Sequence, residues 1–145
     1  MQDYKQFKKD TFSNEPFVIK VDKPWGHEII FTPPHLPYAG KIIHIDAGKR
    51  LSLQVHDEKV ESWILKCGEA KVMWDTDGGE LIETTLLPDQ GFTSMVGQRH
   101  RLIGVTDCEI FEVSSPEKGV TYRLEDDYKR PDETEEMRKS ERAHG

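Results

Sequence analysis

The chain has 145 residues, of which 35% are hydrophobic and 32% charged, and its formal net charge at pH 7 is −7. This length favours a single domain with a real core, and the acidic balance without a basic stripe argues against a nucleic-acid partner. No apolar run reaches membrane-spanning length, so no membrane partner is expected either. The first ten residues lack the apolar segment of a secretory signal, and Cys67 and Cys108 lie in strand-like segments as small core residues. We therefore expect a cytoplasmic protein.

Residues 1–22 form the first predicted segment, a polar arm in which Phe7 and Phe12 are isolated apolar anchors. Residues 17–19 have the composition of a short strand that adds to a sheet edge. The arm is expected to lie either loose or against a neighbouring subunit.

A series of short strands separated by turn residues follows the arm. We count about nine such strands between residues 17 and 114, with turns at intervals of roughly 8–12 residues, which is typical of an all-β sandwich or barrel. A double-sheet jelly roll fits this count. In the strand over residues 40–46, either Lys41 or His44 points into the barrel, and alternation alone does not tell the inner face from the outer.

A possible set of metal ligands lies in the stretch between Gly48 and Gly68. Gln54 and His56 are two residues apart, so on one strand they project from the same face. Residues 57–59 read as a turn, and the apolar run over 63–65 predicts an antiparallel neighbour that carries Glu61 back. An amide oxygen, an imidazole and a carboxylate directed at one point suit a divalent metal. The alternative is an ordinary half-buried strand pair with a satisfied histidine and a surface glutamate.

The spacing of Gly48, His56, Glu61 and Gly68 resembles the first motif of the cupin family, in which a second histidine stands where this chain has Gln54. A glutamine at that position, within LSLQVH, is similar to the cupin domain of type II mannose-6-phosphate isomerases.

The segment from Gly97 to His100 is similar to the end of the second cupin motif and nominates His100 as the fourth ligand. Met95 and Gly104 depart from the usual residues there, at positions that carry no ligand.

The resemblance covers roughly residues 20–130 and implies a cupin double-stranded β-helix over residues 23–130. It also implies one divalent metal ion per chain, with zinc favoured over manganese, iron or nickel, and a homodimer formed by strand exchange. The end of the domain, residues 123–130, resembles an Arg-x-Glu-Asp-x-Tyr-Gly-Arg motif, with Lys129 in place of the glycine. Residues 131–145 then form a charged tail, for which Pro131 predicts a short, frayed and solvated helix.

The function that the resemblance implies is a metal-dependent aldose–ketose isomerase of the mannose-6-phosphate isomerase type, acting on a sugar phosphate. Arg101, Lys41 and Arg130 are the candidate phosphate ligands, and the proton-transferring base is left open between His44, Lys66 and a metal-bound water. The alternatives are another metal-dependent activity, such as that of an oxygenase or an epimerase, and a non-catalytic sugar-binding or sensing module.

Overall fold

The computed structural model describes residues 3–77 and 79–143. The first two residues of the predicted arm and the last two of the predicted tail lie outside the described residues. The described part contains a short 3-10 helix, eleven strands and one α-helix. In chain order these are η1 (Tyr4–Gln6), β1 (Ile19–Lys23), β2 (Gly26–Ile30), β3 (Ala39–Ile45), β4 (Leu53–His56), β5 (Glu61–Cys67), β6 (Ala70–Asp75), β7 (Leu81–Thr85), β8 (Phe92–Ser94), β9 (His100–Gly104), β10 (Cys108–Ser114), β11 (Thr121–Glu125) and α1 (Glu135–Ala143).

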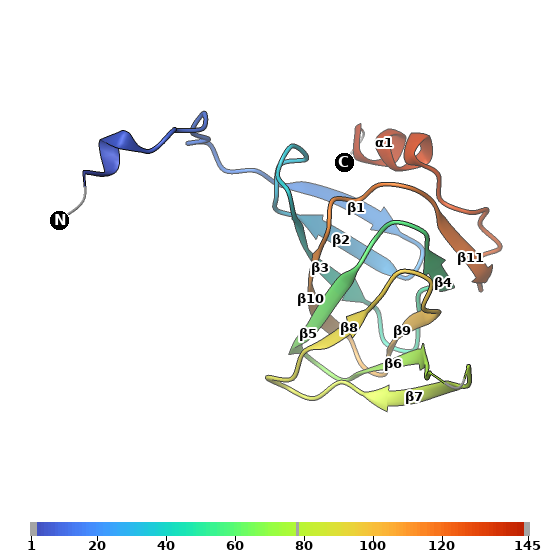
Figure 1. The fold of residues 1–145 in the computed structure, drawn as a ribbon. Helices are drawn as coiled ribbons and strands as arrows, with labels where there is room; N and C mark the ends of the chain where they lie inside the picture. Colours follow the sequence, from blue (N-terminus) through green and yellow to red (C-terminus); the bar gives the residue numbers. More distant parts are fainter. Residues whose placement is uncertain (1–2, 78, 144–145) are drawn as a thin grey trace.

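The strands form two antiparallel sheets that enclose the interior of a barrel (Figure 1). One sheet has six strands in the order β1-β2-β3-β10-β5-β8, and the other has five in the order β11-β4-β9-β6-β7. This arrangement confirms the predicted all-β jelly roll. Two strand predictions need correction: β1 begins at Ile19 and continues to Lys23, and β11 was not anticipated.

Strands that follow one another in the chain often belong to different sheets. This affects the stretch between Gly48 and Gly68, which contains three of the predicted metal ligands. The sequence predicted β4 and β5 to be antiparallel neighbours, but β4 belongs to the five-stranded sheet and β5 to the six-stranded one. The turn over residues 57–59 therefore spans the barrel, and residues on β4 and β5 face each other across the interior.

The interior changes from apolar to charged along the length of β3 and β10. Ile45 pairs with Cys108 and Ile43 with Ile110, and all four side chains are buried in the main core cluster. Burying such a side chain stabilises the fold by about 1.5–3 kcal/mol. The next inward pair is Lys41 with Glu112, which is also buried. The sequence left open whether Lys41 or His44 points into the barrel, and the structure shows that Lys41 does.

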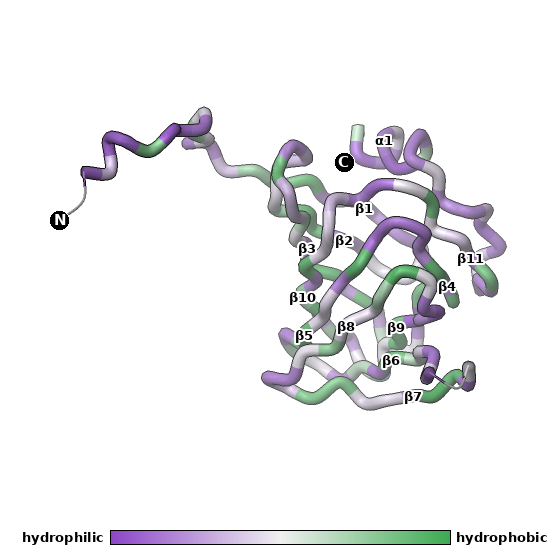
Figure 2. The backbone as a smooth tube through the Cα atoms, in the orientation of Figure 1, coloured by the Kyte–Doolittle hydropathy of each residue, from purple (hydrophilic) through white to green (hydrophobic). Residues whose placement is uncertain are grey.

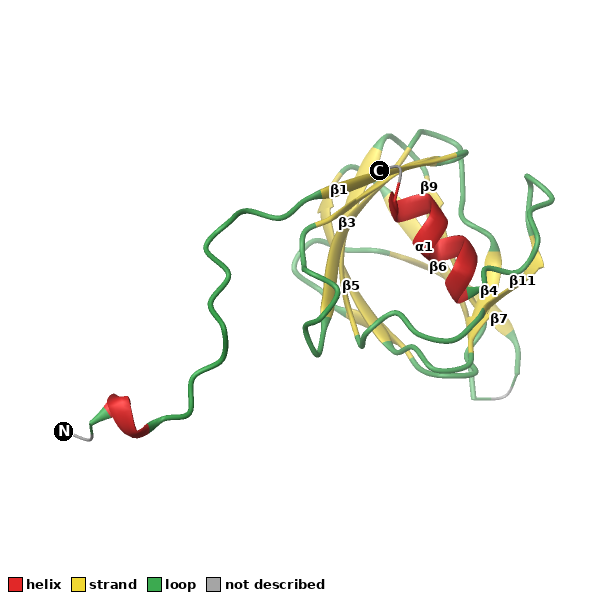
Figure 3. Ribbon diagram, turned by 90° about the horizontal axis from the view of Figure 1, so that it is seen from above, coloured by secondary structure: helices red, strands yellow, loops and turns green. Residues whose placement is uncertain are grey.

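Helix α1 lies across the charged end of the barrel, as the view in Figure 3 shows. Thr134 caps the helix by accepting a hydrogen bond from the Met137 N–H at 3.2 Å. Arg138 is buried and binds a carboxylate oxygen of Glu133 and the carbonyl oxygens of Glu117 and Gly119. The prediction of a frayed, solvated tail is therefore wrong. That prediction depended on the small number of apolar residues in the tail. This mainly hydrophilic helix (Figure 2) instead docks through ion pairs.

The segment from Asp3 to Val18 extends away from the barrel (Figures 1 and 3). Tyr4, Phe7 and Phe12 are 62%, 62% and 70% exposed, so the apolar anchors of this arm have no cover within the chain. Among the described residues, no helix has both the length and the apolar character needed to cross a bilayer.

Candidate metal centre

The four predicted metal-ligating residues converge inside the barrel. Gln54 and His56 come from β4, and His100 comes from the adjacent strand β9, where it pairs with Gln54. Glu61, at the start of β5, approaches from the opposite sheet. His56, Glu61 and His100 are all buried, with at most 4% of each residue exposed. One ligand atom from each of these three residues lies within 4.8 Å of the other two.

Both imidazole rings direct Nε2 at the same carboxylate oxygen. Glu61 Oε1 lies 2.7 Å from His100 Nε2 and 3.3 Å from His56 Nε2. The opposite ring nitrogens are held by the surrounding structure: His56 Nδ1 is 2.9 Å from Thr121 Oγ1, and His100 Nδ1 is 3.0 Å from the Gln98 carbonyl oxygen. This is the arrangement that metal-binding histidines usually have.

His100 Nδ1 has two neighbours: the Gln98 carbonyl oxygen, which only accepts a hydrogen bond, and Ser94 Oγ at 2.9 Å, which can donate or accept. With its proton on Nδ1, a neutral His100 ring can donate to either of them. His100 Nε2 then presents a lone pair to the Glu61 carboxylate, which is also an acceptor. In this tautomer, Nε2 and Glu61 Oε1 are two acceptors 2.7 Å apart, and a cation between them, either a second ring proton or a metal ion, stabilises the arrangement. The donor set therefore fits a divalent metal.

The ionisation of Glu61 and His56 suits the same interpretation. Burial would raise the pKa of Glu61, but the charge of Lys59 and the contacts with His100 and His56 outweigh it and hold that pKa well below its usual range. Burial is the main cause of a lowered pKa for His56, which favours the neutral, metal-binding form of its ring. Glu61 Oε2 has no well-aligned hydrogen bond, although Lys59 Nζ is 2.9 Å away.

Gln54 is the fourth predicted ligand, and its side-chain amide oxygen is the atom that would bind a metal. Its Oε1 accepts a hydrogen bond from Ser52 Oγ at 2.8 Å, and its Nε2 lies 3.3 Å from His100 Nε2. Turning the amide by half a rotation directs the oxygen at the other ligands and leaves the NH2 group to donate to Ser52, so both orientations satisfy the serine.

A small cavity of about 50 Å³ opens beside the ligands, with Gln54 and His56 in its wall. Its lining is strongly charged and includes seven basic side chains and five acidic ones. The basic ones are Lys23, Lys41, Lys59, Arg123, Arg130, Arg138 and Arg142; the acidic ones are Glu28, Glu112, Glu117, Glu133 and Glu141. The cavity is thus locally basic in a chain whose net charge is −7.

The structure places two of the expected phosphate ligands, Lys41 and Arg130, in this lining. Lys41 Nζ is 2.7 Å from Glu28 Oε2 and 3.0 Å from Glu117 Oε1, and these carboxylates hold it in the interior. Arg130 is paired with Asp126 through its Nε at 2.9 Å.

Arg101 lies elsewhere, and its expected position at the mouth must be corrected. It follows His100 on β9, so its side chain leaves the opposite face of the strand. Its Nε donates to the Leu51 carbonyl oxygen at 2.8 Å and its Nη2 to the Glu125 carbonyl oxygen at 3.0 Å. Arg101 is 1% exposed and is absent from the cavity lining. Its contacts tie the segment before β4 and the end of β11 to β9.

His44, the first candidate base, is also on the wrong face. Its neighbours on β3, Ile43 and Ile45, point into the core, so His44 points to the outer face of the six-stranded sheet. Lys66, the second candidate, is exposed and pairs with Glu109 on that outer face at 2.6 Å. Neither residue lies in the lining of the ligand cavity.

Sequence reasoning missed several residues that do surround the ligands. Lys59 was assigned to a turn, yet it is buried and lies 3.2 Å from Glu112. The position of Glu112 could be predicted from the sequence, because on one strand it projects from the same face as the apolar residues Cys108 and Ile110. Arg142 reaches Glu117 from α1, and no local pattern indicated that contact.

Comparisons with known proteins agree with the fold. The family described as "Mannose-6-phosphate isomerase C-terminal" matches residues 12–133. No curated protein sequence matches the chain significantly.

Several solved structures are similar in fold. KdgF from Halomonas sp. is 18% identical, with a TM-score of 0.56, over 66% of this chain and 84% of that one. Oxalate decarboxylase from Bacillus subtilis is 18% identical, with a TM-score of 0.66, over 80% of this chain and 33% of that one. The capsular polysaccharide assembling protein CapF from Staphylococcus aureus is 13% identical, with a TM-score of 0.58, over 81% and 32% respectively. This chain thus spans about a third of the length of the last two proteins, and at these identities the similarity shows the fold alone.

The family match covers most of the chain, including Gln54, His56, Glu61 and His100, and the two-sheet barrel agrees with it. The chain therefore belongs to the cupin-type family of mannose-6-phosphate isomerase C-terminal domains.

Proposed function

We propose that this protein is a metal-dependent aldose–ketose isomerase that acts on a sugar phosphate. The observation that carries the proposal is the convergence of His56, Glu61 and His100, with Gln54 in contact with His100, beside a locally basic cavity. We assign one divalent ion per chain to these ligands, with zinc first and manganese, iron or nickel next.

The chemistry explains why such a site suits this reaction. Isomerisation moves a proton between C1 and C2 of the sugar through an enediolate, and negative charge develops on the carbonyl oxygen. When bound, a divalent ion supplies Lewis-acid stabilisation of that charge. Lys59, with Nζ 2.9 Å from Glu61 Oε2, adds a fixed positive charge next to the ligand set.

The basic side chains of the cavity lining attract the negatively charged phosphate of the substrate. Lys23 is paired with Glu141 of α1 at 2.7 Å, and Glu141 is partly exposed at the rim. We assign the phosphate to Lys23 and Arg142, where it replaces the acidic partners that these side chains have without substrate. Glu112 and Glu117 are two of the five carboxylates that line the cavity, and we assign proton transfer to one of them.

Access to the site requires movement, because a space of about 50 Å³ holds only one or two water molecules. Helix α1 contributes Arg138, Glu141 and Arg142 to the lining, so its displacement enlarges the cavity from the charged end of the barrel. We propose that α1 opens to admit the sugar phosphate.

The test is to load purified protein with Zn²⁺, Mn²⁺, Fe²⁺ or Ni²⁺ and to follow aldose phosphates by NMR for ketose formation. We expect turnover by the loaded wild type and a loss of kcat of at least a hundredfold in His56→Gln. Lys23→Ala is expected mainly to raise KM, because a phosphate contact acts in both the ground state and the transition state. Lys20→Ala, at an exposed lysine on the same strand, is the matched control.

The result that would overturn the proposal is a wild type that binds one metal in the barrel yet isomerises no sugar phosphate. In that case the protein is a metal-binding cupin of another activity or a non-catalytic sugar-binding module. Oxygen uptake with Fe²⁺ would then indicate an oxygenase.

A further inference from the structure

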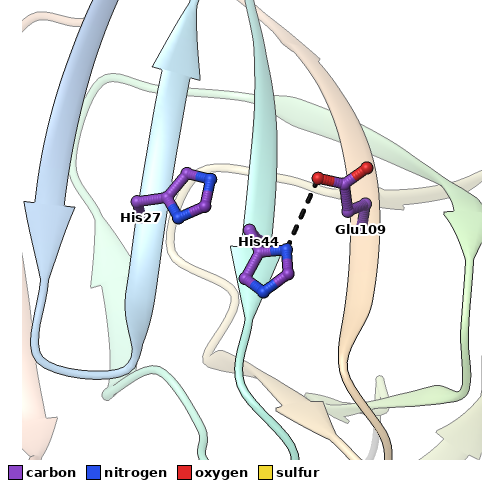
Figure 4. A group of neighbouring side chains, drawn as sticks. All are labelled: His27, His44 and Glu109. Carbon is purple, nitrogen blue, oxygen red and sulfur yellow. Dashed lines mark hydrogen bonds and ion pairs between the residues drawn. The ribbon is translucent and has the colours of Figure 1, made fainter.

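The outer face of the six-stranded sheet carries a second group of metal-ligating side chains. His27 on β2, His44 on β3 and Glu109 on β10 are cross-strand partners on three adjacent strands. Figure 4 shows the two imidazole rings side by side, with the Glu109 carboxylate turned toward His44. The next residues along the strands, such as Ile43 and Ile110, are buried in the core. The sheet itself therefore separates this group from the interior ligands.

The spacing of these side chains is close to that of a metal site. One ligand atom from each of the three residues lies within 4.8 Å of the other two, and His44 Nδ1 is 3.4 Å from Glu109 Oε2. Ligand atoms around a tetrahedral zinc ion are about 3.3 Å apart. The His27 and His44 rings are stacked, with centroids 4.7 Å apart and planes 3° from parallel. A rotation of the His27 ring about its Cβ–Cγ bond is therefore the main adjustment that coordination needs.

The surroundings of His44 and Glu109 assign a role to each of their polar atoms. Asp46 Oδ1 lies 3.4 Å from His44 Nε2, so it can accept the proton of that nitrogen and leave Nδ1 free to coordinate. Glu109 Oε1 is occupied by Lys66 at 2.6 Å, with Cys67 Sγ 3.9 Å away on the same side. Glu109 Oε2 is the oxygen that faces the histidines.

We propose that His27, His44 and Glu109 form a second metal site, distinct from the interior centre, which binds one Zn²⁺ or Cu²⁺ ion with solvent completing the coordination. Two imidazoles and a carboxylate are ligands that both ions accept readily. The half-buried position of all three residues limits the water that a metal must displace from them. Burial, and after it the charge of His44, lowers the pKa of His27, which favours the neutral ring that a metal needs.

The position of Lys66 gives the proposal a distinctive consequence. Its ammonium group is held beside Glu109, and it would lie next to a bound cation and repel it. Lys66→Gln is therefore expected to strengthen metal binding by a fewfold. If the cluster were only a hydrogen-bonded surface network, removal of Lys66 would not increase the affinity for a metal.

The location of the site can be tested with Cu²⁺ and the full-length, ¹⁵N-labelled chain. A Cu²⁺ titration carried beyond the amount that fills the interior centre should broaden the amide signals around residues 27, 44 and 109, and EDTA should restore them. The variant His44→Gln should lose this broadening and lower the affinity for Zn²⁺ at this site at least tenfold, measured by calorimetry. His35→Gln, at an exposed loop histidine, and Cys67→Ser, at the thiol beyond the carboxylate, are the matched controls and should leave binding unchanged.

Two results would overturn the proposal. One is broadening confined to the signals around residues 56, 61 and 100; the other is broadening around residue 44 that persists in both His44→Gln and His27→Gln. Either result leaves the isomerase proposal intact, because that proposal depends on the interior ligands. Conversely, an inactive protein that binds Cu²⁺ on the outer face retains this site.

Discussion

At the scale of single residues, Lys129 has a backbone conformation that favours glycine. Its φ is +54°, and the motif that residues 123–130 resemble has glycine at this position. The turn that the glycine would make is therefore kept despite the substitution. A side chain in this left-handed region costs roughly 1 kcal/mol.

We expect Lys129→Gly to raise the free energy of unfolding by up to about 1 kcal/mol, because relief of strain outweighs the extra entropy of the unfolded chain. Chemical denaturation monitored by circular dichroism measures the change. Lys118→Gly is the matched control: this exposed loop lysine has no positive φ, so its replacement should give no gain. Equal effects in both variants would contradict the assignment of strain to Lys129.

The residues of the metal centre show how far a sequence pattern reaches. Alternation placed Gln54 and His56 on one face of a strand, but the predicted neighbouring strand for Glu61 was wrong, because Glu61 reaches them from the opposite sheet. The family resemblance, which nominates all four ligands, did not depend on that pairing. The same alternation argued against Arg101, which follows His100, yet Arg101 was named as a phosphate candidate and the structure places it outside the cavity. Alternation also left Lys41 and His44 undecided. Only the pairing of β3 with β10 settles which face is inside.

At the scale of elements, helix α1 docks on the barrel through ion pairs that surround a partly buried carboxylate. Glu133, just before the helix, lies near Lys23, Arg123 and Arg138. Burial would raise the pKa of Glu133, but the surrounding positive charges, that of Lys23 first, outweigh it and lower the pKa from 4.5 to about 2.

Because the folded-state pKa of Glu133 lies below its unfolded value, the stabilisation is fully present above pH 4.5 and is lost as the pH falls toward 2. We expect Glu133→Gln to cost on the order of 1–3 kcal/mol of unfolding free energy at pH 7 and much less near pH 2. Denaturant titrations at several pH values measure this difference. Glu136→Gln, at an exposed acid on α1, should have little effect at either pH, and a loss for Glu133→Gln that is the same at both would contradict the argument.

The elements themselves were predicted with uneven success, for physical reasons. The strands between residues 27 and 114 carry alternating or continuous apolar residues bounded by turn residues, and most of them were recognised. β11 and the docking of α1 were missed, because charged side chains such as Arg123 and Arg138 make their contacts through ion pairs that form only in the folded barrel. Hydrophobic periodicity carries no information about such contacts.

At the scale of the whole molecule, the free arm and one sheet face predict a second copy of the chain. The arm exposes Phe7 and Phe12, and β1 is an edge strand of the six-stranded sheet. The outer face of the same sheet also carries Ile42, Phe111 and Ile64 as cross-strand partners. Exposed apolar groups in these places are typical of an interface.

We expect removal of residues 1–18 to convert a dimer into monomers or to weaken it at least tenfold, because strand addition and burial of the arm are lost. Sedimentation over a concentration series measures the change. Phe111→Lys, which leaves the arm intact, tests the contribution of the sheet face to the dimer. Lys139→Ala, at an exposed position on α1, is the control and should leave the dimer unchanged. A wild type that is monomeric at high concentration would contradict the prediction.

The charged end of the barrel has a consequence for how stability varies with temperature. Unfolding exposes apolar surface, which raises the heat capacity, and polar surface, which lowers it. Part of the interior here consists of Lys41, Lys59, Glu61 and Glu112 rather than aliphatic side chains. The heat-capacity change of unfolding should therefore fall below the usual value of about 12–15 cal/mol/K per residue. Scanning calorimetry would reveal this as a flatter stability curve, with resistance to cold as well as to heat.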